Sequence, residues 1–276
     1  MAKVLPKIIL CLAVGFLLFP KPINLTATPK YTICFYNPEI SINNFASLKI
    51  EFDTYLANLG PYQFQPFSDK NTFEKFISEK RDCLFLISSW HFRNLKGKCP
   101  MEPVLVGVLK GKSTQRKILL AMKDSKNLDL LMGSNVASAG SEDYTRNILI
   151  QMLGEKKRGV ANSLRILTVP KDIDALMAVG FGMAKSALAA ESSLDKLSSI
   201  NPKQYEMMKQ LAVSEKTLLP VLAISKNCDK DVEKLVGIIE EMGKMPEGKK
   251  RLKMLGLDGW NRLDESQIKE LEEVNQ

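Results

Sequence analysis

The chain has 276 residues, of which 45% are apolar and 25% charged, so it is a globular protein and not a disordered one. This length allows one large domain or two lobes with separate cores. The formal charge of +8 suits an anionic small ligand or an acidic partner surface. No dense stripe of lysine and arginine is present, so we expect no nucleic-acid partner.

The N-terminal segment has the pattern of an export signal. Lys3 and Lys7 precede an unbroken apolar run from Ile8 to Phe19. Such a run has the length of a signal-peptide core and is too short to span a bilayer comfortably. Cleavage after Ala27 is the expected processing step, and an uncleaved anchor is the alternative. Either way, we expect the rest of the chain to be exported.

Four cysteines follow this segment, at positions 34, 83, 99 and 228. An exported chain can form disulfides, and four cysteines allow three connectivities. Cys34 and Cys83 sit in apolar segments and can be small buried residues. Cys99 and Cys228 sit in polar loops and are the pair that we expect to be bridged. With no Cys-x-x-Cys motif, no Cys/His cluster and one histidine, we expect no metal ion and no cofactor.

From Tyr31 onward, predicted strands and helices alternate, a pattern typical of an open parallel sheet with helices on its faces. We expect Asn71 to cap the second helix and Lys110–Thr114 to form a hairpin turn. The expected strands are residues 31–36, 62–67, 84–87, 104–109, 117–122, 164–169 and 218–224. The expected helices include residues 45–59, 71–77, 143–154, 232–242 and 252–255, and Asp264 with Gln267 forms a capping box for a last helix.

Two segments lie beyond the carboxyl ends of predicted strands, where ligands bind in sheets of this kind. They are residues 36–38 and 88–92, and we expect both to be loops. Together they would form a polar pocket with an aromatic wall, from Tyr36, Asn37, Ser88, Ser89, Trp90 and His91. The alternatives are a core role for Trp90 and a structural role for His91. No nucleophile or orienting carboxylate stands at catalytic spacing, so we expect no enzyme.

A turn of small residues, Ser138-Ala139-Gly140-Ser141, precedes the helix predicted at 143–154 and is the candidate anion site. The first N–H groups of a helix lack partners within the helix, and the positive end of its dipole faces the turn. Gly140 permits close approach of the backbone to a ligand, and Ser138 and Ser141 add hydroxyl groups. An oxyanion is the expected occupant. The alternative is that Ser141 only caps the helix.

Two carboxylates begin the next predicted helix, which is rich in Ala, Gly and Met and extends to Ala187. Asp172 is expected to be its N-cap. Asp174 is the candidate contact for a cationic group of the ligand.

Together these features resemble a type 2 periplasmic binding protein, and most closely the phosphate-, phosphite- and phosphonate-binding family of ABC-transporter solute receptors. The resemblance is carried by the export signal, Tyr36-Asn37-Pro38, Leu84–Phe92, Ser138–Ser141, Val169–Ala190 and Leu219-Pro220-Val221. It implies an α/β fold of two lobes, each a mostly parallel sheet flanked by helices. The implied divisions are a signal peptide at 1–27, lobe one at 28–106 plus 218–276, and an inserted lobe two at 107–217.

The resemblance also implies a function. A monomer in the periplasm would clamp a small phosphonate- or phosphate-like oxyanion between its lobes and deliver it to an ABC permease. One lobe would supply residues from 36–37 and 88–91, and the other would supply the turn 138–141. The alternative is an exported sensor or interaction module that uses the same fold without transport.

Overall fold

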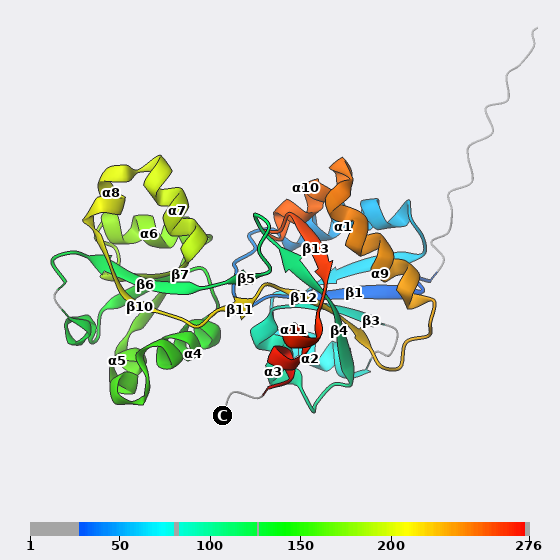
Figure 1. Ribbon diagram of the computed structural model, residues 1–276, viewed down its shortest axis with the longest axis horizontal. Helices are drawn as coiled ribbons and strands as arrows, with labels where there is room; N and C mark the ends of the chain where they lie inside the picture. Colours follow the sequence, from blue (N-terminus) through cyan, green and yellow to red (C-terminus); the bar gives the residue numbers. More distant parts are fainter. Residues whose placement is uncertain (1–27, 80–82, 126, 274–276) are drawn as a thin grey trace, which may run out of the picture.

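The computed structural model describes residues 28–79, 83–125 and 127–273, and the predicted signal peptide at 1–27 lies outside them. Figure 1 shows two α/β lobes side by side, connected by extended segments. A search of the described residues for a helix with the length and hydropathy of a membrane span finds none.

Lobe one is built on a six-stranded sheet with the order β13-β4-β12-β3-β1-β2. β2 and β3 pair with β1 in parallel, and β12 is antiparallel to both β3 and β4. β13 pairs with β4 in the antiparallel sense, so β1 to β4 share one direction and β12 and β13 run the opposite way. The strands are β1 (Tyr31–Tyr36), β2 (Tyr62–Pro66), β3 (Cys83–Ile87), β4 (Met101–Val108), β12 (Val221–Ser225) and β13 (Gly259–Arg262).

Helices cover both faces of this sheet, because successive side chains of a strand point to opposite sides. In β1, Ile33 and Phe35 pack with α1 (Phe45–Ala57), α9 (Val232–Glu240) and α10 (Pro246–Met254). Cys34 and Tyr36 face the other apolar cluster, which includes residues of α2 (Lys70–Glu79), α3 (Ser89–Leu95) and α11 (Glu265–Glu272). The capping box of α11 at Asp264 is confirmed. The cap expected at Asn71 is wrong: α2 begins at Lys70, and the Asp69 carboxylate accepts from the Thr72 amide.

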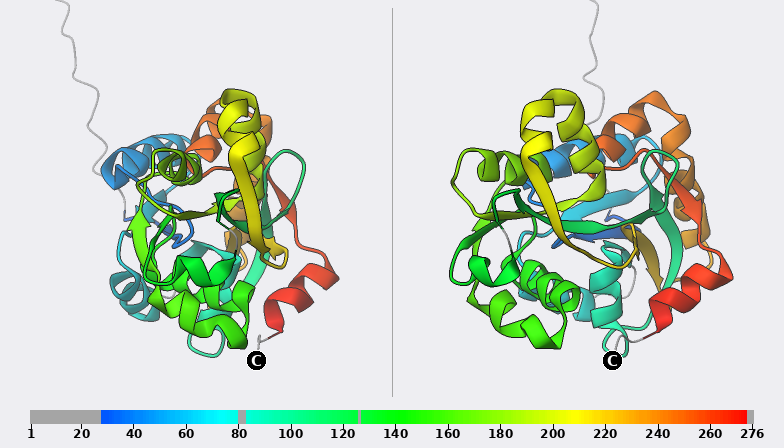
Figure 2. Two further views of the ribbon diagram at one scale, coloured as in Figure 1. Left: turned by 90° about the vertical axis from the view of Figure 1, so that its left-hand side faces the viewer. Right: turned by 60° about the vertical axis from the view of Figure 1, so that its left-hand side comes forward.

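Lobe two has a five-stranded sheet with the order β10-β6-β9-β7-β8. Figures 1 and 2 show α6, α7 and α8 on one side of it and α4 and α5 on the other. The strands are β6 (Lys117–Met122), β7 (Asn135–Ser138), β8 (Arg165–Thr168), β9 (Ser186–Ala190) and β10 (Met208–Val213). The helices are α4 (Glu142–Leu153), α5 (Arg158–Ser163), α6 (Asp172–Gly180), α7 (Glu191–Ile200) and α8 (Pro202–Met207).

The helix expected to extend to Ala187 is wrong in its second half. α6 ends at Gly180, the chain turns at Gly182 with φ +72°, and residues 186–190 form the central strand β9. The alanines of β9 are buried against α6, so small side chains there reflect close packing of a helix on the sheet. The single strand expected at 218–224 is interrupted at Pro220, which cannot donate a backbone hydrogen bond.

The two lobes are joined by an antiparallel ladder of β5 (Thr114–Gln115) and β11 (Thr217–Leu218), in which Thr217 faces Gln115. The expected turn before β5 occurs at Lys110 and Gly111, which have φ of 51° and 75°. The pairing of β4 with β12 brings the loops that carry Cys99 and Cys228 to the same end of the sheet. Their bridging stays a prediction.

Candidate functional site

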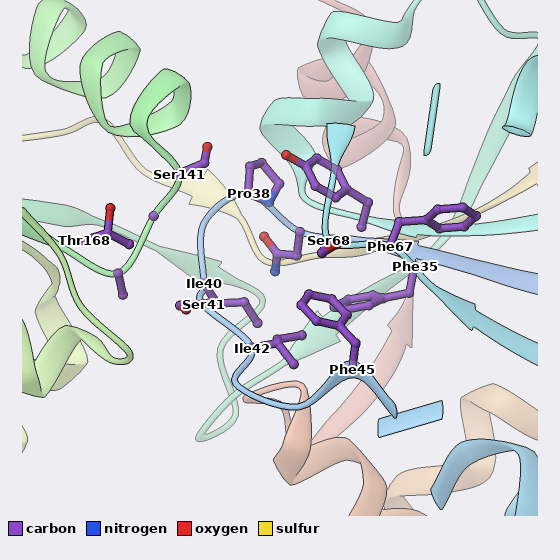
Figure 3. Close-up of a pocket in the computed structure, with 14 residues that line it drawn as sticks. Phe35, Pro38, Ile40, Ser41, Ile42, Phe45, Phe67, Ser68, Ser141 and Thr168 are labelled. Carbon is purple, nitrogen blue, oxygen red and sulfur yellow. The ribbon is translucent and has the colours of Figure 1, made fainter. Parts of the chain in front are cut away.

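A cavity of about 180 Å³, here called cavity A, lies between the loop after β1 and the turn before α4. Figure 3 shows Ser141 and Thr168 of lobe two opposite Pro38 and Ser41 of lobe one. The walls of cavity A come from both lobes. They are formed by Phe35, Tyr36, Asn37, Pro38, Ile40, Ser41, Ile42, Phe45, Phe67 and Ser68 from lobe one, and by Ala139, Gly140, Ser141 and Thr168 from lobe two.

The turn before α4 is folded tightly by its own side chains. The Ser138 hydroxyl accepts from the Gly140 amide at 3.1 Å and shares a hydrogen bond with the Thr145 hydroxyl at 2.9 Å. A Cβ on residue 140 would lie 2.7 Å from Cδ1 of Tyr144 and 3.3 Å from the Pro38 carbonyl oxygen. Glycine is therefore needed here first for the packing of the turn against Tyr144 of the same lobe, and the nearby Pro38 oxygen of lobe one adds a second constraint.

The positive end of α4 is less open than we expected. Ser141 caps the helix by accepting from the Tyr144 amide at 3.3 Å. The Ser141 amide itself donates to the Pro38 carbonyl oxygen at 2.7 Å. Glu142 and Asp143 in the first turn also interact favourably with the helix dipole. The hydroxyls of Ser141 and Thr168, rather than the amides of residues 140 and 141, are therefore the lobe-two donors available in cavity A.

Lobe one supplies neutral polar groups to the same cavity. The Asn37 side-chain oxygen accepts from the Glu39 amide at 3.0 Å, which leaves its NH₂ group as the donor. Tyr36 is largely buried beside Phe73, and this burial raises the pKa of its hydroxyl to about 12. Both side chains can thus donate hydrogen bonds without carrying charge at neutral pH.

The segment 88–92 is the start of a helix, and the expectation of a loop there is wrong. Ser88 is fully buried and accepts from the His91 amide as the N-cap of α3. The Ser89 hydroxyl donates to the Leu218 carbonyl of β11 at 2.6 Å. Trp90 meets Tyr144 of α4 edge-on, with ring centroids 5.5 Å apart. Ser89 thus holds lobe one to the connection and Trp90 holds it to lobe two, and none of the three residues lines cavity A.

His91 lies inside lobe one, between the rings of Tyr36 and Phe73, with 0% exposure. Within the part of the chain that the structure describes, neither ring nitrogen has a hydrogen-bond partner. The Glu74 carboxylate is 3.5 Å from Nε2. Burial, with Lys70 and Lys98 nearby, lowers the pKa of His91 to about 4, so the ring is neutral at pH 7. This is the structural role named as the alternative for His91.

A second cavity, cavity B, has a volume of about 440 Å³ and also lies between the lobes. It shares Asn37, Ile40, Ser41 and Ala139 with cavity A, so the two are neighbours. Its other lining residues are Glu39, Leu109, Gln115, Lys117, Pro170, Lys171, Asp172, Ala190, Ser192, Ser193, Lys196, Leu219, Pro220 and residues 253–257.

Buried charges in the wall of cavity B were not predicted as site residues. Lys117 is 6% exposed, and its ammonium lies 3.2 Å from Asp172, whose carboxylate also accepts from the Ala190 amide at 2.6 Å. The N-cap role expected for Asp172 is therefore wrong, and Lys171 occupies that position. Asp174 is not among the lining residues of either cavity.

Glu39 is the other buried acid of this wall, with 2% exposure. It accepts from the Gln115 side chain at 2.6 Å and is hydrogen-bonded to the Tyr144 hydroxyl. Burial raises the pKa of Glu39. In the sequence, these buried charges were indicated only by Lys117, a lysine at the first position of the otherwise apolar run 117–122. No group of three or more potential metal ligands occurs among the described residues.

Comparison with known proteins agrees with this architecture. A family model described as "ABC transporter, phosphonate, periplasmic substrate-binding protein" matches residues 56–268. The sequence matches none of the curated proteins compared with it.

Similar solved structures share 14–16% identity with this chain, so they bear on the fold alone. XAC2383 from Xanthomonas citri, bound to chloride, has a TM-score of 0.64 at 14% identity and covers 89% of this chain and 96% of its own. A binding protein component of an ABC phosphonate transporter from Pseudomonas aeruginosa has a TM-score of 0.60 at 16% identity, over 88% and 86%. PhnD1 from Prochlorococcus marinus, in complex with methylphosphonate, has a TM-score of 0.60 at 14% identity, over 89% and 97%. The predicted fold class is confirmed.

Proposed function

Since the chain belongs to the family of phosphonate-binding periplasmic substrate-binding proteins of ABC transporters, we propose that it holds its oxyanion in cavity A. Proteins of this family bind small phosphonates and deliver them to ABC permeases. The observation that supports this site is the meeting of two lobes around one cavity. Tyr36 and Asn37 line it from lobe one, and the turn 139–141 lines it from lobe two.

The chemistry of the lining matches a phosphonate. Hydroxyls of Ser41, Ser68, Ser141 and Thr168, with the amide of Asn37, offer hydrogen bonds to the phosphonate oxygens. Hydrogen bonds to a charged acceptor are stronger than neutral ones, so a full salt bridge is not needed. The remaining walls are apolar, and they suit the carbon substituent that distinguishes a phosphonate from inorganic phosphate.

Closure follows from the position of cavity A. A ligand held by both lobes has a higher affinity for the closed arrangement than for an open one, so it shifts the population toward closure. The short β5–β11 ladder is the natural place for the hinge. A permease, or a sensor protein in the alternative function, would then recognise the closed form.

The remaining assignments belong to the same proposal. The chain acts in the periplasm as a monomer, after removal of residues 1–27. Lobe one comprises 28–106 and 218–276, and lobe two comprises 107–217. A pull-down from detergent-solubilised membranes with the purified protein separates transport from sensing. Ligand-dependent capture of a permease supports transport, and ligand-dependent capture of a sensor kinase supports sensing.

Calorimetric titration with methylphosphonate, ethylphosphonate, phosphate and sulfate tests the site. Thr168→Val keeps the shape of the side chain and removes one hydroxyl from cavity A. We expect it to weaken methylphosphonate binding about tenfold or more, because a hydrogen bond to a charged group contributes about 1.5–3 kcal/mol. Thr54→Val, on the exposed side of α1, is the matched control and should bind as the wild type does.

Two results would count against the proposal. One is the absence of heat and of a melting-temperature shift with every oxyanion at millimolar concentration. The other is equal methylphosphonate affinity in Thr168→Val and the wild type, which would mean that the ligand does not bind in cavity A.

A further inference from the structure

More positively charged than negatively charged residues line cavity B. Four lysines line it, Lys117, Lys171, Lys196 and Lys253, against two acids, Glu39 and Asp172. Cavity A next to it has no charged residue in its lining. The positive charge of the cleft is therefore concentrated on one side of the predicted phosphonate position.

Three of these lysines are exposed at the cavity and come from different lobes. Lys171 and Lys196 belong to lobe two, at the start of α6 and in α7, and Lys253 belongs to α10 of lobe one. None of the three forms an ion pair with the residues that the structure describes. Closure of the lobes brings these like charges toward one cavity, which costs free energy unless an anion lies between them.

The two acids do not supply that anion. The Asp172 carboxylate is already engaged by the Lys117 ammonium and the Ala190 amide. The Glu39 carboxyl is hydrogen-bonded to Gln115 and Tyr144, and the residue is only 2% exposed. Burial also raises the pKa of Glu39.

We propose that the substrate is a phosphonate with a second anionic group: the phosphonate lies in cavity A, and the second group lies in cavity B among Lys171, Lys196 and Lys253. This inference rests on the proposed function and narrows its substrate class. The second group is a carboxylate or a phosphate-type anion, which share the chemistry that lysines recognise. A phosphonate with a cationic amine is disfavoured, because its ammonium would enter a cavity with excess positive charge.

Calorimetry with matched ligands tests the inference. Phosphonoacetate, ethylphosphonate and 2-aminoethylphosphonate differ mainly in the charge of the substituent, and methylenediphosphonate replaces the carboxylate with a second phosphonate. We expect phosphonoacetate or methylenediphosphonate to bind at least about tenfold more tightly than ethylphosphonate, since each partly exposed ion contact contributes up to about fivefold. The preference should weaken as salt rises from about 0.02 M to 0.5 M.

The lysines are tested with Lys171→Gln, Lys196→Gln and Lys253→Gln, singly and together. The combined variant should bind phosphonoacetate and ethylphosphonate with nearly equal affinity, because the three lysines contact only the second anionic group. Lys249→Gln, on the same helix as Lys253 but outside the cavity lining, is the control and should keep the preference. Circular dichroism checks that each variant is folded.

The outcomes separate this inference from the proposed function. If ethylphosphonate binds but phosphonoacetate and methylenediphosphonate bind no better, or if 2-aminoethylphosphonate binds best, the inference is overturned and the proposed function stands. The same holds if the combined lysine variant keeps the full preference. If no phosphonate of any kind binds, both are overturned.

Discussion

The amide of Ser141 in lobe two donates a hydrogen bond to the carbonyl oxygen of Pro38 in lobe one, across 2.7 Å. A backbone oxygen of one lobe thus meets the start of a helix in the other. Because the contact lies on the wall of cavity A, any movement of the lobes changes the cavity and this hydrogen bond together.

Gly140→Ala should hinder closure. The added methyl group would lie 2.7 Å from the Tyr144 ring and 3.3 Å from the Pro38 oxygen. Overpacking of this kind costs about 1–3 kcal/mol, so we expect methylphosphonate affinity to fall about tenfold and small-angle scattering to show a more open molecule. Gly159→Ala, where nothing lies within 4 Å of the added carbon, should change neither. An unaltered affinity in Gly140→Ala would mean that close approach of the lobes is not needed for binding.

Tyr144→Phe removes a hydroxyl that joins the lobes. This hydroxyl is hydrogen-bonded to the buried Glu39, so its loss leaves that carboxyl with one partner fewer. We expect a loss of about 1–3 kcal/mol from the free energy of unfolding, measured by urea denaturation. Tyr205→Phe, at a side chain with 42% exposure, should change stability little. Equal stability in the two variants would contradict a role for the Glu39–Tyr144 contact.

Tyr144→Phe should also leave the tryptophan environment intact. The edge contact between ring 144 and Trp90 does not need the hydroxyl. In a Trp260→Phe background, Trp90 is the single tryptophan, because the chain has two. Its fluorescence should therefore report ligand-induced closure in both the tyrosine and the phenylalanine form.

His91 should make stability depend on pH. The pKa of its ring is about 4 in the folded chain, against 6.5 for the ordinary group. Since the unfolded chain binds the proton first, stability is full above about pH 6.5 and is lost as pH falls toward 4, by about 3 kcal/mol in total. His91→Phe should flatten this part of the profile, measured by urea denaturation from pH 4 to 8. A profile that keeps its slope in the variant would assign the effect to other groups.

Asp172→Asn should be far more costly than the loss of a surface ion pair. It removes the carboxylate that lies 3.2 Å from the buried Lys117 ammonium and leaves Glu39 as the acid near it, and removal of one partner of a buried pair costs about 3–5 kcal/mol. Asp129→Asn breaks the exposed pair with Lys157 and should cost less than about 1 kcal/mol. Similar losses in thermal or urea unfolding would show that the Lys117 pair is solvated.

Much of the fold was predictable because apolar periodicity reports burial. The apolar segments of β1, β3 and β6 marked strands inside the sheets, and the capping box at Asp264 marked a helix start. Small residues were harder to interpret. Alanine is compatible with both helix and strand, so Ser186–Ala190 was assigned to a helix although it forms β9.

Site residues were predictable only where the course of the backbone alone determines their position. Residues at strand ends and in the turn 138–141 reach the cleft because the fold ends its strands there. Lys117 and Glu39 could not be assigned, because their role depends on Asp172 and Tyr144, which are distant in the sequence and adjacent only after folding. Ser88 and Ser89 have hydroxyls of the same kind as Ser141, but their partners lie inside lobe one and in β11.

The most direct measurement of the central claim is a crystal structure of the protein with methylphosphonate. We expect the phosphonate in cavity A, with oxygens within hydrogen-bond distance of the hydroxyls of Ser141 and Thr168 and of the Asn37 amide. Density for the ligand on one lobe alone, or outside the space between residues 37–41 and 139–141, would contradict the account.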